Sequence, residues 1–497
     1  MCRKVDRTIS HNSPKNGLMD LEPRIHMKKP HVVLIPFPAQ SHIKCMLKLA
    51  RLLHHKGLYV TFINTHTNHK LLVDSGGLEE APGFWYKTVP DGLGSATQEG
   101  AKAIEVIHEV MAYLATNFFD CFLDVVSGLE NPVTCIICDG FMTFTNTIDA
   151  AEKLNIPIML FWTMAACGFM GFYQAKVLTE KHIIPLKDES YLKNGYLDME
   201  IDWIPGMKGI RLKDLPEFVQ ATKHDDFAFS YLLETAQAAD KVSHMIIHTF
   251  EELEASINNK IRSMYPSVYT IGPLQLLLNQ ITKTETNICY SLRKEEPECV
   301  QWLNSKEPNS VVYVNFGSLA VMSVQDLLEF GWGLVNSNHY FLWIIRTDLV
   351  DGKPSVLPQE LDEAINEKGF VGSWCSQEEV LNHPAVGGFL THCGWGSIIE
   401  SLSAGVPMLC WPSIGDQRTN CRQTCKEWEV GMEIARNVKR DEVEKLVRAL
   451  MEGLEGERMR KKALEWKKMA EIATNVNGSS RLDTDNLANE IIKLSRN

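Results

Sequence analysis

Short apolar runs alternate along the chain with longer segments in which apolar residues recur every three to four positions. The run "HVVLIPFP" (residues 31–38) predicts a buried strand, residues 42–56 follow with a helical period, and "LYVTFINT" (residues 58–65) predicts a second strand. The same order of strand, helix and strand recurs with "VTCIICDG" (residues 133–140), a helical pattern over residues 143–154 and a further apolar run, "IPIMLFW". Strand, helix and strand at this spacing are typical of a parallel α/β domain.

A second series of apolar runs begins at "VVYVNFGS" (residues 311–318). A helical pattern follows over residues 324–335, and four further strand-like runs come after it: "YFLWIIR", "GFVGSW", "VGGFLTH" and "VPMLCW". Between the two series the chain is polar and charged, as a surface linker is. We therefore predict an α/β protein with two Rossmann-like halves that face each other across a cleft.

The predicted boundaries divide the 497 residues into five parts. In chain order these are a disordered N-terminal extension (residues 1–26), a first Rossmann-like domain (27–270), a linker (271–308), a second Rossmann-like domain (309–475) and a C-terminal helix that packs back on the first domain (476–497). Ligands of open parallel sheets bind outside the carboxyl ends of the strands. Residues that directly follow strands are therefore the candidates for a functional site.

Charge and cysteine content narrow the classes of partner and compartment. The formal net charge is -12, which disfavours nucleic acid or an anionic membrane surface as the main partner. The 13 cysteines show no disulfide-framework spacing, and the first 26 residues lack the apolar core of a secretory signal. No run reaches the roughly 18 apolar residues of a membrane span. We expect a cytoplasmic protein that acts as a monomer.

Residues 387–417, "GGFLTHCGWGSIIESLSAGVPMLCWPSIGDQ", combine a strand, a glycine-rich turn and a helix. Such a turn presents unpaired backbone N–H groups at the positive end of the helix, which suits a phosphate. A tight turn needed only for packing is the alternative.

Four further side chains lie at the ends of neighbouring predicted elements. Trp374 offers an indole face to a flat base, and Glu400 offers acceptors for ribose hydroxyls. Asp416 and Gln417 offer partners for the hydroxyls of a sugar. Taken singly, a core tryptophan, a solvated glutamate and a helix N-cap are the alternatives. Together with the glycine-rich turn, these groups predict a nucleotide-sugar site.

From Trp374 to Gln417 the sequence resembles the signature segment of plant UDP-sugar-dependent glycosyltransferases that act on small molecules. Identities and spacings both agree with "W-x-x-Q … H-x-G-W-x-S … E … G-x-P … W-P … D-Q", and the likeness extends over nearly the whole chain, from "IPFPAQSH" through "VYVNFGS". The resemblance implies the GT-B architecture, with the UDP-sugar in the C-terminal half and the acceptor in the N-terminal half. It also implies UDP-glucose as co-substrate and neither a cofactor nor a metal.

The resemblance assigns the donor contacts residue by residue. It implies that Trp374 stacks on uracil, that Cys375 contacts the uracil edge through its backbone, and that ribose is bound by Gln377 and Glu400. The remaining assignments are Ser318, His392, Gly394 and Ser397 for the diphosphate, and Thr163, Trp395, Asp416 and Gln417 for the sugar. One position departs: the family usually has Asn where this chain has Gly396, so a side-chain amide near the phosphate and sugar is missing.

A histidine and an aspartate follow two strands of the first predicted sheet. His42 lies where an acceptor hydroxyl would enter, and a carboxylate such as Asp139 would stabilise the imidazolium that forms when the histidine takes a proton. The resemblance assigns them these roles, although Ser41 and Cys45 replace the usual Gly and Pro around His42. A helix-start histidine and a turn aspartate are the alternatives.

The likeness is strongest to the subgroup that glucosylates diterpenoid alcohols such as steviol, through stretches such as "IDWIPGMKGIRLKDLP" and "SNHYFLWIIR". We therefore expect an inverting O-glucosyltransferase that forms a β-glucoside on an apolar alcohol. Glucosylation of iridoid, monoterpenol or cyanohydrin acceptors is the alternative. The candidate acceptor contacts, each of which is equally an ordinary core residue, are Leu93, Phe144, Phe169, Met170 and the small Gly415.

A different class, an NAD(P)-dependent oxidoreductase, also suits two Rossmann-like halves. It is disfavoured because neither half has G-x-G-x-x-G after its first strand.

The motif Asp483-Thr-Asp485 matches the metal-binding D-x-D of another glycosyltransferase fold, but it precedes an amphipathic C-terminal segment, so we interpret it as helix capping.

Overall fold

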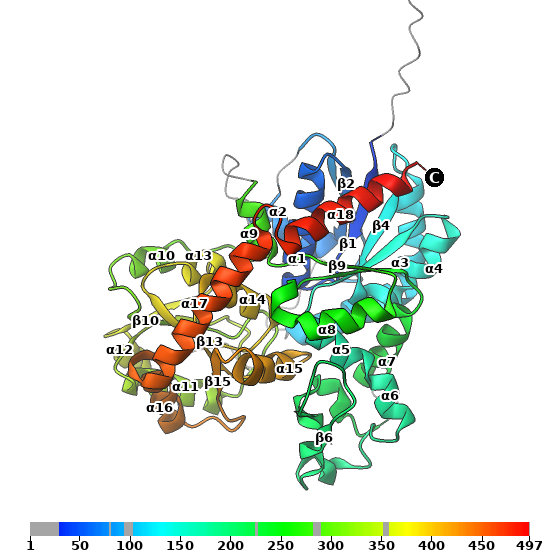
Figure 1. Cartoon of the computed structure of the whole chain (residues 1–497). Helices are drawn as coiled ribbons and strands as arrows, with labels where there is room; N and C mark the ends of the chain where they lie inside the picture. The colour runs from blue at the N-terminus through cyan, green and yellow to red at the C-terminus, as the bar shows by residue number, and fades with distance from the viewer. Residues whose placement is uncertain are drawn as a thin grey trace, which may run out of the picture.

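Two parallel sheets, each covered by helices, lie side by side in the computed structural model of the chain (Figure 1). The structure describes residues 29–78, 81–93, 103–223, 227–281, 290–350 and 357–496, so the predicted extension at residues 1–26 falls outside them. The first sheet has strand order β3-β2-β1-β4-β5-β8-β9, and the second has order β12-β11-β10-β13-β14-β15. Two Rossmann-like halves were predicted, and this fold class is confirmed.

All pairings within both sheets are parallel. The strands of the first sheet are β1 (His31–Ile35), β2 (Tyr59–Thr65), β3 (Phe84–Val89), β4 (Cys135–Asp139), β5 (Ile158–Trp162), β8 (His244–Ile247) and β9 (Ser267–Thr270). Those of the second are β10 (Val311–Asn315), β11 (Tyr340–Ile344), β12 (Gly369–Gly372), β13 (Val386–Thr391), β14 (Met408–Cys410) and β15 (Gly431–Glu433). A short antiparallel pair, β6 (Glu200–Ile201) and β7 (Ile210–Arg211), stands apart.

Helices fill the connections between the strands. In the first half they are α1 (Gln40–His55), α2 (His66–Asp74), α3 (Ala103–Ser127), α4 (Thr147–Lys153), α5 (Ala166–Tyr173), α6 (Ala175–Glu180), α7 (Phe227–Ala239), α8 (Glu251–Met264) and α9 (Leu274–Asn279). The second half and C-terminus have α10 (Glu298–Leu303), α11 (Val324–Asn336), α12 (Gln359–Ile365), α13 (Gln377–Leu381), α14 (Trp395–Ala404), α15 (Gln417–Arg422), α16 (Arg440–Glu452), α17 (Leu454–Thr474) and α18 (Ser479–Leu494).

The continuous apolar runs reflect burial of the sheets on both faces. In β1, Val32 and Leu34 pack into a cluster with α1, α9 and α18, whereas Val33 and Ile35 pack on the opposite face with α3 and α5. All five residues of β1 are buried. The alternation of side chains along a strand thus serves two apolar layers at once.

Two elements differ from the sequence prediction. The helix expected over residues 143–154 is split into a short 3-10 helix, η1 (Gly140–Thr145), and α4, because Asn146 between them adopts a left-handed conformation with φ of 57°. The segment expected as a linker contains α9 and α10, and α9 packs against α1. A short helix of this kind owes its stability to tertiary packing, which polar composition does not reveal.

The C-terminal helices join the two halves. Helix α17 packs against α14 of the second half and runs to the first half, where α18 lies against β9 (Figure 1). Asp483 lies inside α18, so the prediction that it caps this helix was wrong. Its carboxylate accepts hydrogen bonds from the backbone N–H and hydroxyl of Thr270, both at the end of β9. The side chain ties the last helix to the first sheet.

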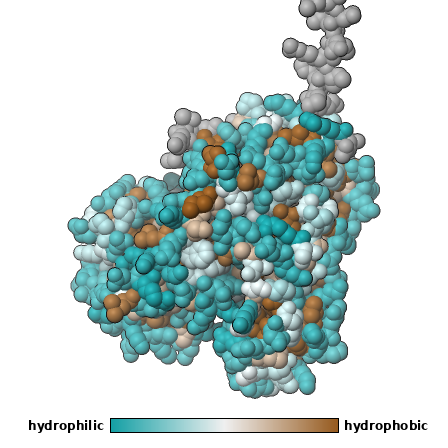
Figure 2. Space-filling model, viewed as in Figure 1, coloured by the Kyte–Doolittle hydropathy of each residue, from teal (hydrophilic) through white to brown (hydrophobic). Residues whose placement is uncertain are grey.

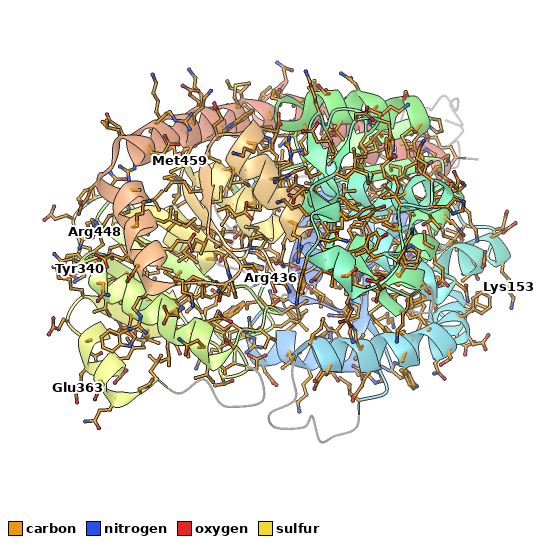
Figure 3. All side chains as sticks on the ribbon, turned by 90° about the horizontal axis from the view of Figure 1, so that it is seen from below. Lys153, Tyr340, Glu363, Arg436, Arg448 and Met459 are labelled. Atoms are coloured by element: carbon orange, nitrogen blue, oxygen red, sulfur yellow. The ribbon has the colours of Figure 1, made fainter. Side chains whose placement is uncertain are left out.

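Helix α3 is the one described helix whose length and composition would suit a membrane span. It runs along the first half in Figure 3. Met111, Leu114, Phe118 and Phe122 form a stripe at helical spacing that packs into the core of the first half.

The face of the molecule shown in Figure 2 is mainly hydrophilic, with apolar residues scattered over it.

Candidate active site

A cavity of about 1680 Å³ lies between the carboxyl ends of the two sheets. Residues that follow β1, β4 and β5 line it from one side, and residues that follow β10, β12, β13 and β14 line it from the other. Arg436, labelled in Figure 3 where the two halves meet, contributes to its lining. The volume exceeds the range of about 300–1,000 Å³ that is usual for one small ligand, so it has room for two.

His42 and Asp139 meet at the wall of this cavity. His42 Nδ1 lies 2.8 Å from Asp139 Oδ2, and the carboxylate is fully buried. The other oxygen, Oδ1, accepts the backbone N–H of Phe141 at 3.0 Å. Because the carboxylate is held at both oxygens, it fixes the ring and favours the tautomer in which Nδ1 donates to Asp139 and Nε2 is the acceptor. Asp139 therefore caps the turn that follows β4 and also pairs with His42, so both roles expected of it are present.

Thr163 lies closer to the base than expected. Its hydroxyl oxygen is 2.8 Å from His42 Nδ1, so it shares the ring nitrogen with Asp139. Phe37 and Phe141 flank the ring, with centroids 5.0 Å and 5.3 Å away. The imidazole is therefore confined by two aromatic rings and a hydrogen-bonded edge, and only its free edge is left for a substrate.

His392 occupies a gap that only glycine can provide. A Cβ on Gly317 would lie 2.3 Å from His392 Nε2, and one on Gly394 would lie 2.5 Å from the same atom. Gly317 also has φ of 72°, a left-handed conformation that disfavours side chains. Burial and then the nearby Arg346 guanidinium lower the pKa of His392 to about 4, so the ring is neutral at pH 7.

The start of helix α14 faces the same cavity, which Ser318, Gly394, Gly396 and Ser397 line together with His392. Gly394 precedes the first helical residue, Trp395. The first turn of this ten-residue helix therefore lies at the cavity wall, and its unpaired N–H groups suit an anion there.

Gln377, Glu400 and Ser397 form one hydrogen-bonded group. Gln377 Nε2 donates to Ser397 Oγ at 3.0 Å and to Glu400 Oε2 at 2.8 Å. Its Oε1 accepts from the Asn315 amide at 3.0 Å and the Tyr313 hydroxyl at 3.2 Å. The two residues predicted to bind ribose thus lie in contact, and their side chains are already oriented.

Trp374 and Cys375 end the strand region that precedes this group. The indole N–H of Trp374 donates to Ser291 Oγ at 2.8 Å, and the Arg293 guanidinium lies 5.6 Å from the centre of its ring. The half-buried Trp374 and the buried Cys375 both line the cavity. The alternative of a fully buried core tryptophan does not hold.

Asp416 and Gln417 follow β14 at the far end of the donor side. Asp416 makes no side-chain capping bond to α15 and instead accepts from Asn420 Nδ2 at 3.0 Å. Burial raises the pKa of Asp416 to about 6. Gln417 Oε1 accepts the backbone N–H groups of Ser413 and Ile414 at 2.8 Å and 3.0 Å. That oxygen is fully used, so toward a ligand Gln417 has only its N–H groups to offer.

Comparison with known proteins decides the family. The family described as "UDP-glucoronosyl and UDP-glucosyl transferase" matches residues 219–469. UDP-glycosyltransferase 85C1 of Stevia rebaudiana is 79% identical over 483 residues, which cover 96% of this chain and all of that protein. The chain belongs to the UDP-glycosyltransferase family. It is therefore a glycosyltransferase, and the oxidoreductase alternative no longer stands.

More distant relatives of this UDP-glycosyltransferase carry names that state an acceptor. A 7-deoxyloganetin glucosyltransferase of Catharanthus roseus is 49% identical over 93% of this chain and 96% of its own length, and an (R)-mandelonitrile β-glucosyltransferase of Prunus dulcis is 46% identical over 95% and 99%. A crystal structure of UDP-glucose: anthocyanidin 3-O-glucosyltransferase with UDP superposes with a TM-score of 0.78 at 26% identity, covering 94% of this chain and all of that one. The fold is the GT-B fold.

The candidate acceptor residues need correction. Of the five, Gly415 alone lines the cavity. Phe169 and Met170 are fully buried in the core, and Phe144 and Leu93 are half-buried against it. Helix α5, which carries Phe169 and Met170, is apolar all round, so its sequence gives no sign of which face meets the cavity.

Other apolar side chains of the UDP-glycosyltransferase line the acceptor side, and sequence reasoning did not single them out. They come from the end of β1, from α3, η1, α5 and η5 (Glu217–Gln220), and from α7, and they are Phe37, Ile104, Ile107, Met111, Phe141, Phe172, Phe218 and Tyr231. A signal existed for two of them: Phe37 and Phe141 follow strands at the carboxyl edge where ligands of such sheets bind.

Trp395 and the two small glycines complete the donor side. The indole N–H of the buried Trp395 donates to the carbonyl of His248 in the first half at 2.6 Å, so this side chain joins the two halves. A Cβ on Gly396 or on Gly415 would meet no atom within 4 Å, although Gly415 has φ of 63°.

Three buried thiols lie behind the glycine-rich turn. Cys393, Cys410 and Cys421 place their sulfur atoms within 4.8 Å of one another, the one such metal-ligand group in the described part of the chain. Burial raises the pKa of the Cys393 thiol, and the pKa of Cys421 is raised to about 11. These protonated thiols pack as small apolar groups that support the donor loop.

Space around Gly396 allows a direct test of the residue that departs from the family pattern. Gly396→Asn should fit without strain and add an amide beside the diphosphate and sugar, so we expect the KM for UDP-glucose to fall while the KM for the acceptor stays nearly constant. Steady-state kinetics with each substrate varied in turn measure both constants. An unchanged donor KM would show that backbone N–H groups already satisfy those oxygens.

Proposed function

We propose that this UDP-glycosyltransferase transfers glucose from UDP-glucose to a hydroxyl group of an apolar terpenoid alcohol, with inversion at the anomeric carbon. One observation carries the proposal: the free edge of His42, held by Asp139, shares a cavity with the N-terminus of α14. A base for the acceptor and an anion site for the leaving diphosphate thus lie on opposite walls of one space.

The proposed reaction is a single displacement. His42 Nε2 takes the proton of the acceptor hydroxyl while that oxygen forms a bond to the anomeric carbon. The bond from this carbon to the UDP oxygen breaks on the opposite face, so an α-linked donor gives a β-glucoside. Charge that develops on the diphosphate is stabilised by the first N–H groups of α14 and by His392. The proposal requires no metal ion.

An apolar acceptor suits the lining of the first half. Phe37 and Phe141 flank His42, Phe172 packs against Phe141, and all three line the cavity. Such a surface binds a rigid hydrocarbon skeleton by burial rather than by hydrogen bonds. The sequence resemblance to the diterpenoid subgroup favours a steviol-like alcohol. Iridoid and cyanohydrin acceptors, which the names of two relatives state for those proteins, are the second candidates.

Acceptor-dependent release of UDP tests the proposal. The purified protein is incubated with UDP-glucose and a panel of diterpenoid, iridoid, monoterpenol and cyanohydrin alcohols, with and without EDTA, and the products are identified by mass. We expect a single added hexose, fastest on a diterpenoid alcohol and unchanged by EDTA. UDP release that does not depend on any alcohol would contradict transfer, and a faster iridoid or cyanohydrin would replace the diterpenoid assignment.

The raised pKa of Asp416 predicts how donor binding depends on pH. A carboxylate accepts hydrogen bonds from sugar hydroxyls only at oxygens that carry no proton. Since the pKa of Asp416 is about 6, we expect affinity for UDP-glucose to be full above pH 7 and to fall as the pH drops through 6. Calorimetric titration between pH 5 and 8 measures this. In Asp416→Asn the affinity should be lower, and the loss below pH 6 should be absent; a retained loss would assign it to another group.

A further inference from the structure

An ammonium group from the acceptor half reaches into the ribose side of the donor site. Lys44 lies near the start of α1, two residues after His42, and its Nζ is 2.7 Å from Glu400 Oε1 and 2.6 Å from Glu378 Oε1. Glu400 lies on α14 and Glu378 on α13, both in the second half. One lysine thus bridges two carboxylates across the boundary between the halves.

Two members of the charged group around Lys44 are shielded from water. Glu400 is 7% exposed, and Lys48, one turn further along α1, contacts Glu378 and is 4% exposed. Burial works against the charge on Lys44, but Glu378 and Glu400 outweigh it and raise the pKa of the lysine. A buried carboxylate that loses its cation either takes up a proton or turns toward water. The Lys44 ammonium on Oε1 and the Gln377 amide on Oε2 therefore hold the Glu400 carboxylate in one orientation.

The contacts of Glu400 leave room for a ligand. A carboxylate has about four acceptor positions. Lys44 uses one of them on Oε1 and Gln377 uses one on Oε2. Two positions remain, one on each oxygen, which equals the number of hydroxyls on a ribose. Glu400 lines the cavity, so these positions are accessible to a nucleotide.

Positions i and i+2 of a helix point in different directions. His42 faces Asp139 and the acceptor side, whereas Lys44 faces Glu400 and the donor side. One turn of α1 therefore touches the machinery for both substrates. If the halves separate, Lys44 leaves Glu400 and His42 leaves the sugar together.

We propose that Lys44 is a positioning residue for the donor: it holds Glu400 for the ribose hydroxyls and makes ribose recognition depend on closure of the two halves. The proposal rests on the proposed function for its consequence in catalysis, but its first consequence is nucleotide binding, which requires no acceptor.

Binding of UDP and 2′-deoxy-UDP to the full chain tests this directly. Lys44→Met removes the ammonium and keeps most of the side-chain length. We expect it to weaken UDP about tenfold while 2′-deoxy-UDP changes about twofold, so that the preference for UDP shrinks. Lys44→Arg, which keeps the charge, should restore most of the preference. Lys56→Met is the matched control, because Lys56 ends the same helix region and pairs with Asp485 far from the cavity.

Three results would overturn the proposal. They are an unchanged preference in Lys44→Met, tighter UDP binding in that variant, which would mean that Lys44 competes with ribose, and an equal loss in Lys56→Met. If Lys44→Met does not fold, Lys44→Gln supplies the same comparison. In kinetics the KM for UDP-glucose should rise about tenfold with kcat within about threefold. Absence of transfer by the unchanged enzyme would instead contradict the proposed function and leave the binding result standing.

Discussion

Replacement of His42 by alanine is expected to lower the rate of transfer by about 10²- to 10⁴-fold, the usual cost of removing a positioned base, while UDP still binds. The ring contacts Asp139, Thr163 and aromatic side chains of the acceptor half, and none of its described contacts lies on the nucleotide side. Acceptor-dependent turnover and the dissociation constant of UDP, measured on the same preparation, separate the two effects.

Asp139→Asn provides the matched variant for the base. Asparagine keeps the shape and can still accept a hydrogen bond at one oxygen, but it does not stabilise an imidazolium by charge. We expect a clear loss of turnover that is smaller than the loss in His42→Ala, again with UDP binding retained. Near-normal turnover in His42→Ala would contradict the proposed mechanism. A loss of UDP binding in either variant would show that the change acts through the fold.

The fold was predictable because central strands such as β1, β4 and β10 are continuous, fully buried runs, whereas the partly exposed edge strand β3 is not. Two local features did not follow from the pattern of apolar residues. Asn146 interrupts a helical period with a left-handed residue, and α9 is a short helix that forms against α1 inside a polar segment. The first is a local backbone conformation that asparagine adopts more readily than most residues, and the second depends on packing between segments that are distant in sequence. The periodicity of apolar residues within one segment reports neither of them.

The site could be predicted where a functional residue lies at or just after the carboxyl end of a strand. His42, His392 and Asp416 come after strands β1, β13 and β14, and all three line one cavity. Asp139 is the last residue of β4 and meets the cavity wall through its contact with His42. Contacts between the halves were not predictable, because they require the relative placement of two sheets. The contact of Lys44 with Glu400 is the clearest example, since 356 residues separate the pair.

The chemistry of individual side chains was also only partly visible in the sequence. Gln417 was expected to donate and accept toward the sugar, yet its oxygen is used by two backbone N–H groups of its own loop. Toward a ligand its side chain can therefore only donate hydrogen bonds. Thr163 was assigned to the sugar and lies against the base. In both cases a residue type allowed several partners, and local geometry selected among them.

Gly317→Ala is expected to lower kcat/KM by about 10²- to 10³-fold, the range found when one preorganised donor to a developing negative charge is lost. The new methyl group would overlap His392 Nε2, and the φ of 72° would add about 1–2 kcal/mol of backbone strain. The ring, the loop or both must move, and the diphosphate then loses a donor. Gly396→Ala, in the same cavity but with open space around its Cβ, is the matched control and should stay near the activity of the unchanged enzyme.

A double-mutant cycle separates the steric effect on His392 from a general effect on the loop. If the overlap with the imidazole causes the loss, Gly317→Ala should cost little more once His392→Ala has removed the ring, apart from the strain of the left-handed residue. Additive losses would mean that Gly317 acts on the loop by itself, through the carbonyls of Gly317 and Ala320 that Arg346 holds. Gly317 would then determine the conformation of the donor loop rather than leave space for the His392 ring.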